Sequence, residues 1–371
     1  MNMAITNEEK FLRTTFSRHY EKGKTTVLDA GKREFGFGGW EKKIEFRHIG
    51  VKNTEELRGK LVSEAPLYVS HSVGYYEFPD ARPMARKNWL GADLVFDLDA
   101  DGGACGKRCG KFTCQICLDA VKKDAQRLLG DFLLSDFGFS KDDISLNFSG
   151  SRGYHVHVVS DAVRSLDRDA RREIADYVTG TGLSFDRLFW EDGKKLFGPT
   201  TTQGGFGGKF AREYVKRLDE DGFALSVSRK LRKAEEREKL KSAIANGNWD
   251  NIGIANRERK LAEKFDGMKL TLAGRIDANV TADTSKLIRM PDSIHGGSGL
   301  MAKRITLDEL EGFEPMRDAI AFSGGKLRVK ATEAVPMVPH IVPLPIASGE
   351  TIELPEASAI YLLCKKAAIL A

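Results

Sequence analysis

Four cysteines within thirteen consecutive residues constrain this chain more than any other feature of its sequence. Their spacing is Cys-x3-Cys-x4-Cys-x2-Cys, and they are Cys105, Cys109, Cys114 and Cys117. Four thiolates so close in sequence suit one tetrahedral zinc ion, and the basic residues between them favour the thiolate form. Because protein ligands would fill all four positions, the zinc is expected to be structural, in a zinc knuckle at about residues 104–118. The alternative is a cluster of buried cysteines without a metal. The fifth cysteine, Cys364, is isolated and is expected to take no part.

The remaining composition indicates a soluble protein without a membrane segment. Of 371 residues, 41% are hydrophobic, which is ample for a sizeable core, yet no apolar run approaches the roughly 18 residues that a membrane helix needs. No secretory signal opens the chain, and clustered cysteines favour a metal site over disulfides, so we expect a reducing compartment, the cytoplasm. Lys plus Arg (58) exceeds Asp plus Glu (53) by five, which permits a polyanionic partner without requiring one.

Alternating apolar patterns and helical spacing predict a mixed α/β fold. A period-2 strand ends in acids at residues 94–99, and a helix is expected over about 118–132. Two further strands, 144–148 and 154–159, flank Ser-Gly-Ser-Arg-Gly and predict a hairpin. Residues 36–39 are expected to form a turn, and the strand pattern is expected to resume at 275–280.

Composition also suggests three parts. Residues 1–164 are expected to form the first part of a catalytic core, and 265–371 its second part with a C-terminal segment. Between them, residues 165–264 are rich in Arg, Lys, Glu and Ala and predict a helical insertion. Its charged run at 229–241 reads as a solvated helix in preference to a nucleic-acid contact.

Two aspartates close the strand at 94–99. Residues two apart on a strand face the same side, with Cα atoms about 6.6 Å apart, so Asp97 and Asp99 could grip hard cations together. The alternative without function is a strand that ends in solvated acids, because Asp-x-Asp is common by chance. The same pattern also occurs in glycosyltransferases. A third acid, Asp277, becomes a candidate through the basic residue and histidine that follow it, Arg289 and His295.

The segment Ser-Gly-Ser-Arg-Gly-Tyr-His-Val-His resembles a phosphate cradle. Its glycines let the backbone turn round an anion, while the donors to phosphate oxygens would be Ser149, Arg152 and His155. A metal-binding pair of His155 and His157, or simply a polar hairpin face, are the alternatives.

Taken in order, these motifs resemble the archaeo-eukaryotic primase small subunit family. The resemblance covers roughly residues 33–300, with a weaker echo at 353–364, and includes an Arg-Glu-Phe at Arg33. It implies a primase-type catalytic core with a helical subdomain. It also implies three metal-binding aspartates for two Mg²⁺ or Mn²⁺ ions, at Asp97, Asp99 and Asp277, and nucleotide contacts at Ser149, Arg152, His155, Arg289 and His295.

By resemblance, the chain is a DNA primase catalytic subunit that makes short primers from nucleoside triphosphates on single-stranded DNA, with a primase large subunit as its heterodimer partner. Ser151 departs from the family, since many relatives have arginine there. Two rival functions stay open. One is a repair or plasmid polymerase of the same superfamily, and the other is a zinc-containing nucleic-acid-binding protein without catalytic activity.

Overall fold

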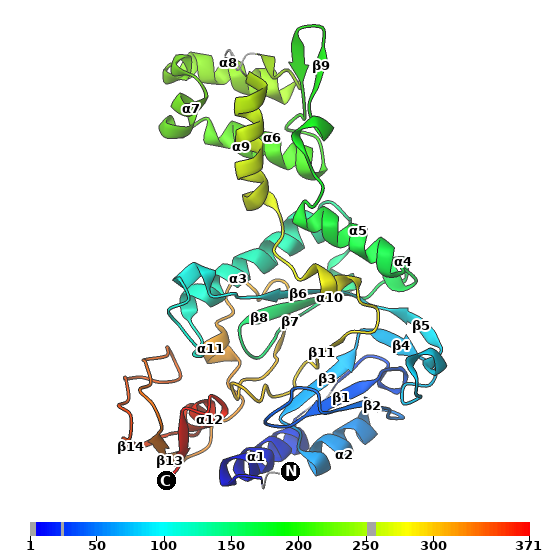
Figure 1. Cartoon of the computed structure of the whole chain (residues 1–371), viewed down its shortest axis with the longest axis vertical. Helices are drawn as coiled ribbons and strands as arrows, with labels where there is room; N and C mark the ends of the chain where they lie inside the picture. The colour runs from blue at the N-terminus through cyan, green and yellow to red at the C-terminus, as the bar shows by residue number, and fades with distance from the viewer. Residues whose placement is uncertain (1–4, 24–25, 251–256) are drawn as a thin grey trace. The chain divides into compact units, whose positions relative to one another are not determined.

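The computed structural model describes residues 5–23, 26–250 and 257–371 (Figure 1). The chain forms two compact units. The first contains 1–129, 139–173 and 276–371, and the second contains 130–138 and 174–275. The sequence placed the insertion at 165–264, whereas the second unit begins and ends about ten residues later and recruits a short earlier segment. None of its described helices is long and apolar enough to cross a membrane.

Two four-stranded antiparallel sheets form the centre of the first unit. One has the strand order β11-β3-β1-β2 and the other β12-β7-β8-β6. The strands are β1 (Phe35–Gly38), β2 (Phe46–Ile49), β3 (Tyr68–Ser72), β6 (Leu94–Asp99), β7 (Ile144–Phe148), β8 (Gly153–Val158), β11 (Leu287–Arg289) and β12 (Arg304–Ile305). A hairpin of β4 (Gly74–Tyr76) and β5 (Trp89–Ala92) links β3 to β6. The mixed α/β class and the β7–β8 hairpin are as the sequence predicts.

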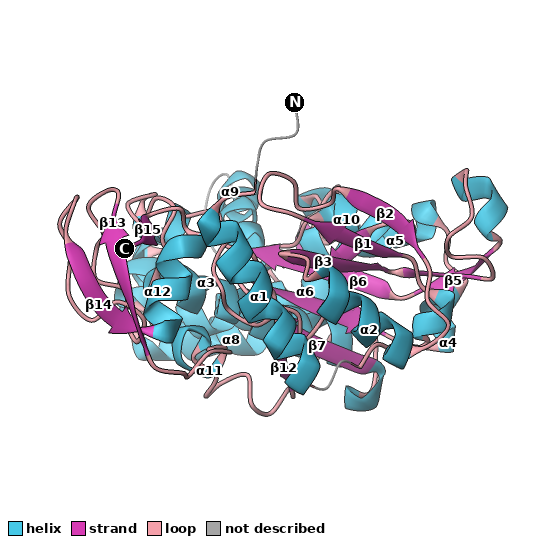
Figure 2. Cartoon of the chain, turned by 90° about the horizontal axis from the view of Figure 1, so that it is seen from below, coloured by secondary structure: helices cyan, strands magenta, loops and turns pink. Residues whose placement is uncertain are grey.

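Helices cover these sheets. The chain begins with α1 (Asn7–Lys22), and α2 (Thr54–Glu64) lies beside it against the first sheet (Figure 2). Both helices start at side-chain caps, since Thr6 accepts from the Glu9 N–H and Asn53 from the Glu56 N–H. The second sheet packs against α3 (Gln115–Arg127) and α10 (Ala278–Ala282). The first unit also contains α4 (Asp161–Arg164) and α11 (Pro315–Asp318), and α5 (Arg168–Thr179) begins in it and ends in the second unit.

A third sheet ends the first unit. It has the order β14-β13-β15, from β13 (Lys326–Ala331), β14 (Thr351–Pro355) and β15 (Ala368–Leu370). The helix α12 (Glu356–Cys364) connects β14 to β15, and every residue from Ser358 to Cys364 is buried.

Two local predictions were wrong, and one predicted helix is present with different bounds. Residues 36–39 are mostly strand, because β1 pairs with both β2 and β3. The glycines serve close packing and not a turn, since a Cβ would clash with Leu287 at Gly36 and with the Lys43 carbonyl at Gly38. Residues 275–280 form no strand, because the Asp277 carboxylate caps a helix instead. The helix expected at 118–132 begins earlier, at Gln115, and becomes a π-helix at Leu128–Leu134.

The second unit has its own aromatic core. Its elements are β9 (Trp190–Asp192), β10 (Lys195–Phe197), α6 (Gly205–Arg217), α7 (Asp221–Val227), α8 (Ala234–Ala245) and α9 (Arg257–Leu272). Trp249 is fully buried among Phe189, Phe210 and Tyr214, and its indole N–H donates to the Pro199 carbonyl at 3.0 Å. The two ends of the unit meet where the Gly274 N–H donates to the Val178 carbonyl at 2.8 Å.

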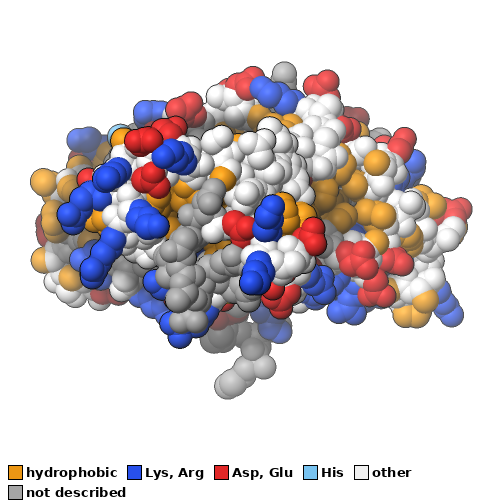
Figure 3. All heavy atoms as spheres, turned by 90° about the horizontal axis from the view of Figure 1, so that it is seen from above, with side chains coloured by type: hydrophobic (Ala, Val, Ile, Leu, Met, Phe, Trp, Pro, Cys, Tyr) orange, Lys and Arg blue, Asp and Glu red, His pale blue; other side chains and the backbone are white. Residues whose placement is uncertain are grey.

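The charged run at 229–241 lies on the surface of this unit. Lys239 pairs with Glu235, and Lys241 with Glu238, each at 2.8 Å. The side of the molecule seen in Figure 3 likewise carries basic and acidic side chains together. These local ion pairs are what the solvated-helix interpretation predicts.

Candidate active site

Three aspartates meet at one end of β6. Asp97 and Asp99 lie on one face of the strand, opposite His155 and Gly153 of β8 in the antiparallel register. The backbone N–H of Asp277 donates to the carbonyl of Asp97 at 2.9 Å, which brings the third acid to the same strand end. About 180 residues separate Asp97 from Asp277, so only the fold makes them neighbours.

The charges of these acids are poorly compensated. Asp97 Oδ1 is buried, and no group in the described part of the chain forms a hydrogen bond with it. Burial, together with the charges of Asp99 and Asp277, raises the pKa of Asp97 to about 7. Partial burial also raises the pKa of Asp99 above its ordinary value. An orphaned carboxylate oxygen beside two further carboxylates fits hard divalent cations, which would replace the missing partners.

His155 lies against this group as a neutral donor. Its Nδ1 accepts a hydrogen bond from the Asn147 side-chain amide at 3.4 Å, so its proton is assigned to Nε2, which is 3.5 Å from Asp97 Oδ1. Burial holds the pKa of His155 well below its ordinary value. His155 therefore offers an N–H to this site and no positive charge.

The turn between β7 and β8 is shaped by Ser149. Its Oγ accepts from the backbone N–H groups of Gly153 at 3.1 Å and Ser151 at 3.4 Å. Gly150 has φ 80°, and a Cβ there would stand 2.8 Å from the His295 Cβ. A glycine is therefore needed for the turn to pack against the segment that carries His295. Arg152 is exposed at this turn, and its charge acts to lower the pKa of Asp99.

Arg289 and His295 lie on the far side of the turn. The Arg289 guanidinium is 4.9 Å from the centre of the Tyr68 ring and donates to the Val69 carbonyl at 3.3 Å. Burial lowers the pKa of Arg289 to about 10, so it stays charged at neutral pH. His295 Nδ1 accepts from the Gly297 N–H at 3.2 Å, which leaves Nε2 as a donor. Burial, and then the charge of Arg289, keep the pKa of His295 well below its ordinary value.

The structure thus brings together the eight residues expected for the cation and nucleotide sites, whereas His157 lies apart from them, beside Asp93. All belong to the first unit: Asp97, Asp99, Asp277, Ser149, Arg152, His155, Arg289 and His295. The structure also places near these residues several lysines that belong to no sequence motif. Lys43 and Lys286 act electrostatically on Asp97, and Lys43 and Lys365 act on His295. Isolated lysines carry no spacing signal, so the sequence alone did not point to them.

The four clustered cysteines converge on one point. Their sulfur atoms all lie within 4.8 Å of one another, and Cys105 Sγ is 3.3 Å from Cys109 Sγ. A zinc ion with Zn–S bonds of about 2.3 Å needs sulfur atoms roughly 3.8 Å apart, so the group is close to the required tetrahedron. Hydrogen bonds from the Cys109 backbone and neighbouring thiols lower the pKa of Cys105 to about 6, which favours a thiolate. The cluster could hold zinc.

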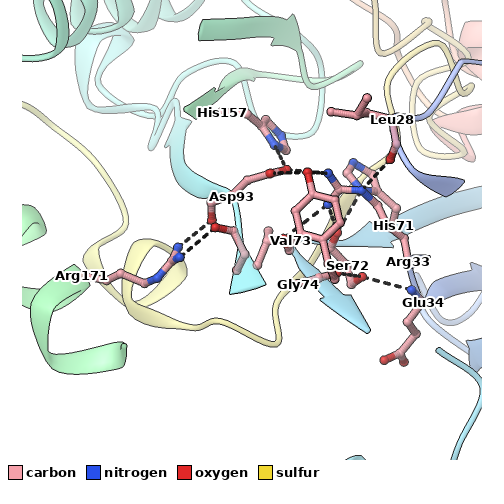
Figure 4. Close-up of polar contacts among 12 residues, drawn as sticks. Leu28, Arg33, Glu34, His71, Ser72, Val73, Gly74, Asp93, His157 and Arg171 are labelled. Atoms are coloured by element: carbon pink, nitrogen blue, oxygen red, sulfur yellow. Dashed lines mark hydrogen bonds and ion pairs between the residues drawn. The ribbon is translucent and has the colours of Figure 1, made fainter. Parts of the chain in front are cut away.

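A second polar cluster, which no sequence motif predicts, lies at the other end of β6 (Figure 4). Asp93 accepts from Arg33 at 2.7 Å and from Tyr75 at 2.7 Å, and all three are buried. The Arg171 guanidinium donates to the backbone carbonyls of Ala92 and Asp93, as the dashed lines show. In the sequence, Arg33 stands out only as part of Arg-Glu-Phe. The lone Asp93 gives no signal in the sequence because nothing there shows its partner.

Known proteins are similar to this chain over most of its length. A family model described as DNA primase small subunit matches residues 96–307. DNA primase small subunit PriS of Methanocella arvoryzae is 36% identical over 395 residues, which cover 96% of this chain and 97% of that protein. PriS of Thermoplasma volcanium is 37% identical over 85% of this chain and 82% of its own length, and PriS of Haloarcula marismortui is 35% identical over 87% and 88%.

Proposed function

This chain belongs to the DNA primase small subunit family, and from that premise we propose that it synthesises short primers from nucleoside triphosphates on a single-stranded DNA template. The observation that carries the proposal is the meeting of Asp97, Asp99 and Asp277 at one strand end, where Asp97 Oδ1 is buried without a hydrogen-bond partner among the described residues. Family membership supports a primase catalytic role, and this geometry is what nucleotidyl transfer requires.

We assign the three aspartates to two divalent cations, Mg²⁺ or Mn²⁺. Such ions, when bound there, would activate the attacking 3′-hydroxyl and stabilise the pyrophosphate leaving group. The chain's own contribution is to present three carboxylates on rigid elements. Asp97 must give up its proton to bind a cation, and the neutral His155 beside it adds no competing charge.

The triphosphate is assigned to the basic side of the site. Arg152 and Arg289 supply permanent charge, and His155 and His295 supply neutral N–H donors at Nε2. Ser149, whose oxygen accepts two backbone N–H groups, keeps its hydroxyl proton free for a phosphate oxygen. Two segments, the β7–β8 turn and residues 289–295, can therefore hold a nucleotide beside the acids.

Primer synthesis on an unprimed template tests the proposal. We expect the protein, with Mg²⁺ or Mn²⁺ and nucleoside triphosphates, to release pyrophosphate and form short products, and Asp277→Ala to abolish both. Asp101→Ala is the matched control, because Asp101 follows the same acidic strand but only caps the Gly103 N–H. Extension of added primers without de novo synthesis would favour a repair polymerase, and no pyrophosphate release would favour a non-catalytic DNA-binding protein.

A second measurement tests the triphosphate assignment. Charge-assisted contacts are worth about 1.5–3 kcal/mol, so Arg152→Ala should weaken nucleotide use by roughly 10- to 150-fold. Arg289→Ala should do the same, and affinity for single-stranded DNA should change little in either variant. Loss of DNA affinity with an unchanged KM for nucleotide would place both arginines in the template groove.

We further propose one structural zinc per chain at the cysteine cluster and a primase large subunit as partner. Metal analysis of the purified protein should find one zinc, which Cys114→Ser should lose and Cys364→Ser should keep. A zinc content near zero in the unmodified protein would contradict the assignment. Copurification of the two subunits after coexpression would test the partner.

A further inference from the structure

The C-terminal helix α12 packs directly on the nucleotide side of the site. A Cβ at Gly299, in the turn after His295, would stand 2.6 Å from Ile360 Cγ2 and 3.5 Å from Cys364 Sγ, so nothing separates turn and helix. On its other side, the Tyr361 hydroxyl accepts from the Thr113 N–H at 2.9 Å. The helix is thus fixed between the His295 turn and the cysteine loop.

Lys365 is the first residue after this helix. Its Nζ is 5.3 Å from the centre of the Tyr361 ring, and its charge is close enough to His295 to lower that group's pKa. Among the residues that the structure describes, none forms an ion pair or hydrogen bond with this ammonium. Burial, followed by the charge of Arg152, lowers the pKa of Lys365 to about 8.

The next lysine provides a contrast. Lys366 is exposed and pairs with Glu41 at 3.1 Å, and its Nζ lies 5.2 Å from the centre of the Trp40 ring. Lys365, by comparison, is partly buried and faces other cations. The charged and titratable groups that act on it or on which it acts are Arg152, Lys111, Cys364 and His295. A desolvated cation without a counter-ion is unfavourable, and an anionic ligand would relieve it.

We propose that Lys365 binds the triphosphate of the incoming nucleotide as a third, C-terminal source of positive charge. The inference rests on the proposed function, because Arg152 and His295 belong to the triphosphate pocket assigned there. It extends the pocket to a residue outside the matched region 96–307. It also gives α12 a purpose beyond packing, which is to set the position of the ammonium.

Steady-state kinetics on a primed template tests the role of Lys365. Lys365→Ala should raise the KM for nucleotide about 10-fold with a smaller change in kcat. Lys365→Arg should return the KM most of the way to that of the unmodified protein. Lys366→Ala is the matched control and should stay within about twofold, as expected for a surface ion pair. Affinity for single-stranded DNA should not change in any of the three variants.

The outcomes separate this inference from the proposed function. If Lys365→Ala keeps the KM of the unmodified protein while Arg152→Ala raises it, Lys365 is not a nucleotide ligand although the pocket assignment stands. If Lys365→Ala weakens DNA binding alone, its phosphate partner is the template and the inference is wrong.

A pH profile provides a readout that a purely structural role would not change. Because Lys365 loses its proton near pH 8, the KM for nucleotide should rise between pH 7.5 and 9 in the unmodified protein, at saturating metal. Lys365→Arg should flatten this rise, since arginine stays protonated throughout. An equally steep rise in Lys365→Arg, or a flat profile in the unmodified protein, would overturn the proposal even if Lys365→Ala folded poorly.

Discussion

Two aspartate–histidine pairs lie between β8 and the segment that runs from Asp93 to the end of β6, and the two pairs have opposite properties. At one end Asp93 faces His157, with Oδ2 and Nδ1 3.7 Å apart, and at the other Asp97 faces His155 at 3.5 Å. Burial raises the pKa of Asp93, but His157 and the charge of Arg33 outweigh burial and bring it well below its ordinary value. Burial raises the pKa of Asp97 to about 7, and nothing opposes it strongly.

The difference lies in the partners and not in the pair itself. Asp93 accepts hydrogen bonds from Arg33 and Tyr75, whereas Asp97 has an orphaned Oδ1 and two acidic neighbours. An internal counter-ion makes the first pair a structural connection between the sheets. The lack of one makes the second pair a place for an external cation. The same substitution at the two aspartates should therefore have opposite effects.

The largest expected effect is on catalysis. Asp97→Asn should lower primer synthesis on the order of 10³-fold, because a neutral amide cannot replace a carboxylate beside two divalent cations. Asp93→Asn, assayed below its melting temperature, should stay within about 10-fold, as expected for a group that only positions others. Rates of pyrophosphate release provide the measurement. Equal losses in the two variants would remove the distinction between the pairs.

The second effect is on stability. Asp93→Asn should lower the free energy of unfolding by about 3–5 kcal/mol, since it leaves Arg33 buried without its partner. The contribution of Asp93 is present above the ordinary aspartate pKa, because its folded pKa is depressed, and it is lost in acid. Urea unfolding should show a large loss of stability in Asp93→Asn at pH 7.5 and a smaller loss near pH 2, closer to the depressed folded pKa of Asp93. Asp101→Asn is the control and should change little at either pH.

Asp97→Asn should instead stabilise the metal-free protein. Because the folded pKa of Asp97 is raised, the folded state holds a proton that the unfolded chain releases between about pH 4 and pH 7, so stability falls as pH rises through that window. Removing the acid should raise the free energy of unfolding at pH 8 by on the order of 2 kcal/mol, with no gain at pH 4. With added Mg²⁺, Asp97→Asn should instead lower the free energy of unfolding relative to the unmodified protein. Destabilisation by Asp97→Asn without metal would show that Asp97 has an internal partner after all.

The smallest effect concerns cation affinity. Below pH 7 the apparent affinity for Mn²⁺ should rise about tenfold per pH unit as Asp97 loses its proton, and then level off. Asp93→Asn should not change the pH at which the Mn²⁺ affinity levels off. Calorimetric titration with Mn²⁺ at several pH values measures it, and a pH-independent affinity would mean that Asp97 is already ionised.

The sequence predicted those parts of the site that are encoded as local patterns. The alternating strand at 94–99, the hairpin around Ser149 and the cysteine spacing each depend on a few consecutive residues. Asp93 with Arg33, and Lys365 with Arg152, depend on contacts between distant segments, and one sequence does not reveal them. Asp277 shows the limit clearly. Its proximity to Asp97 follows the expectation, but the surrounding 275–280 is not a strand, because helix capping decided the local structure.

The position of Asp277 has a consequence for how the protein is made. The chain leaves the first unit after Glu173 and returns at Ile276, immediately before the third aspartate. A ribosome must therefore finish the whole second unit before the acidic trio can form. Because Gly274 and Val178 hold the ends of that unit together, its prior folding would shorten the effective loop between Asp97 and Asp277 and reduce the entropy lost on closing it. Nascent chains that stall within residues 174–275 would lack the metal site altogether.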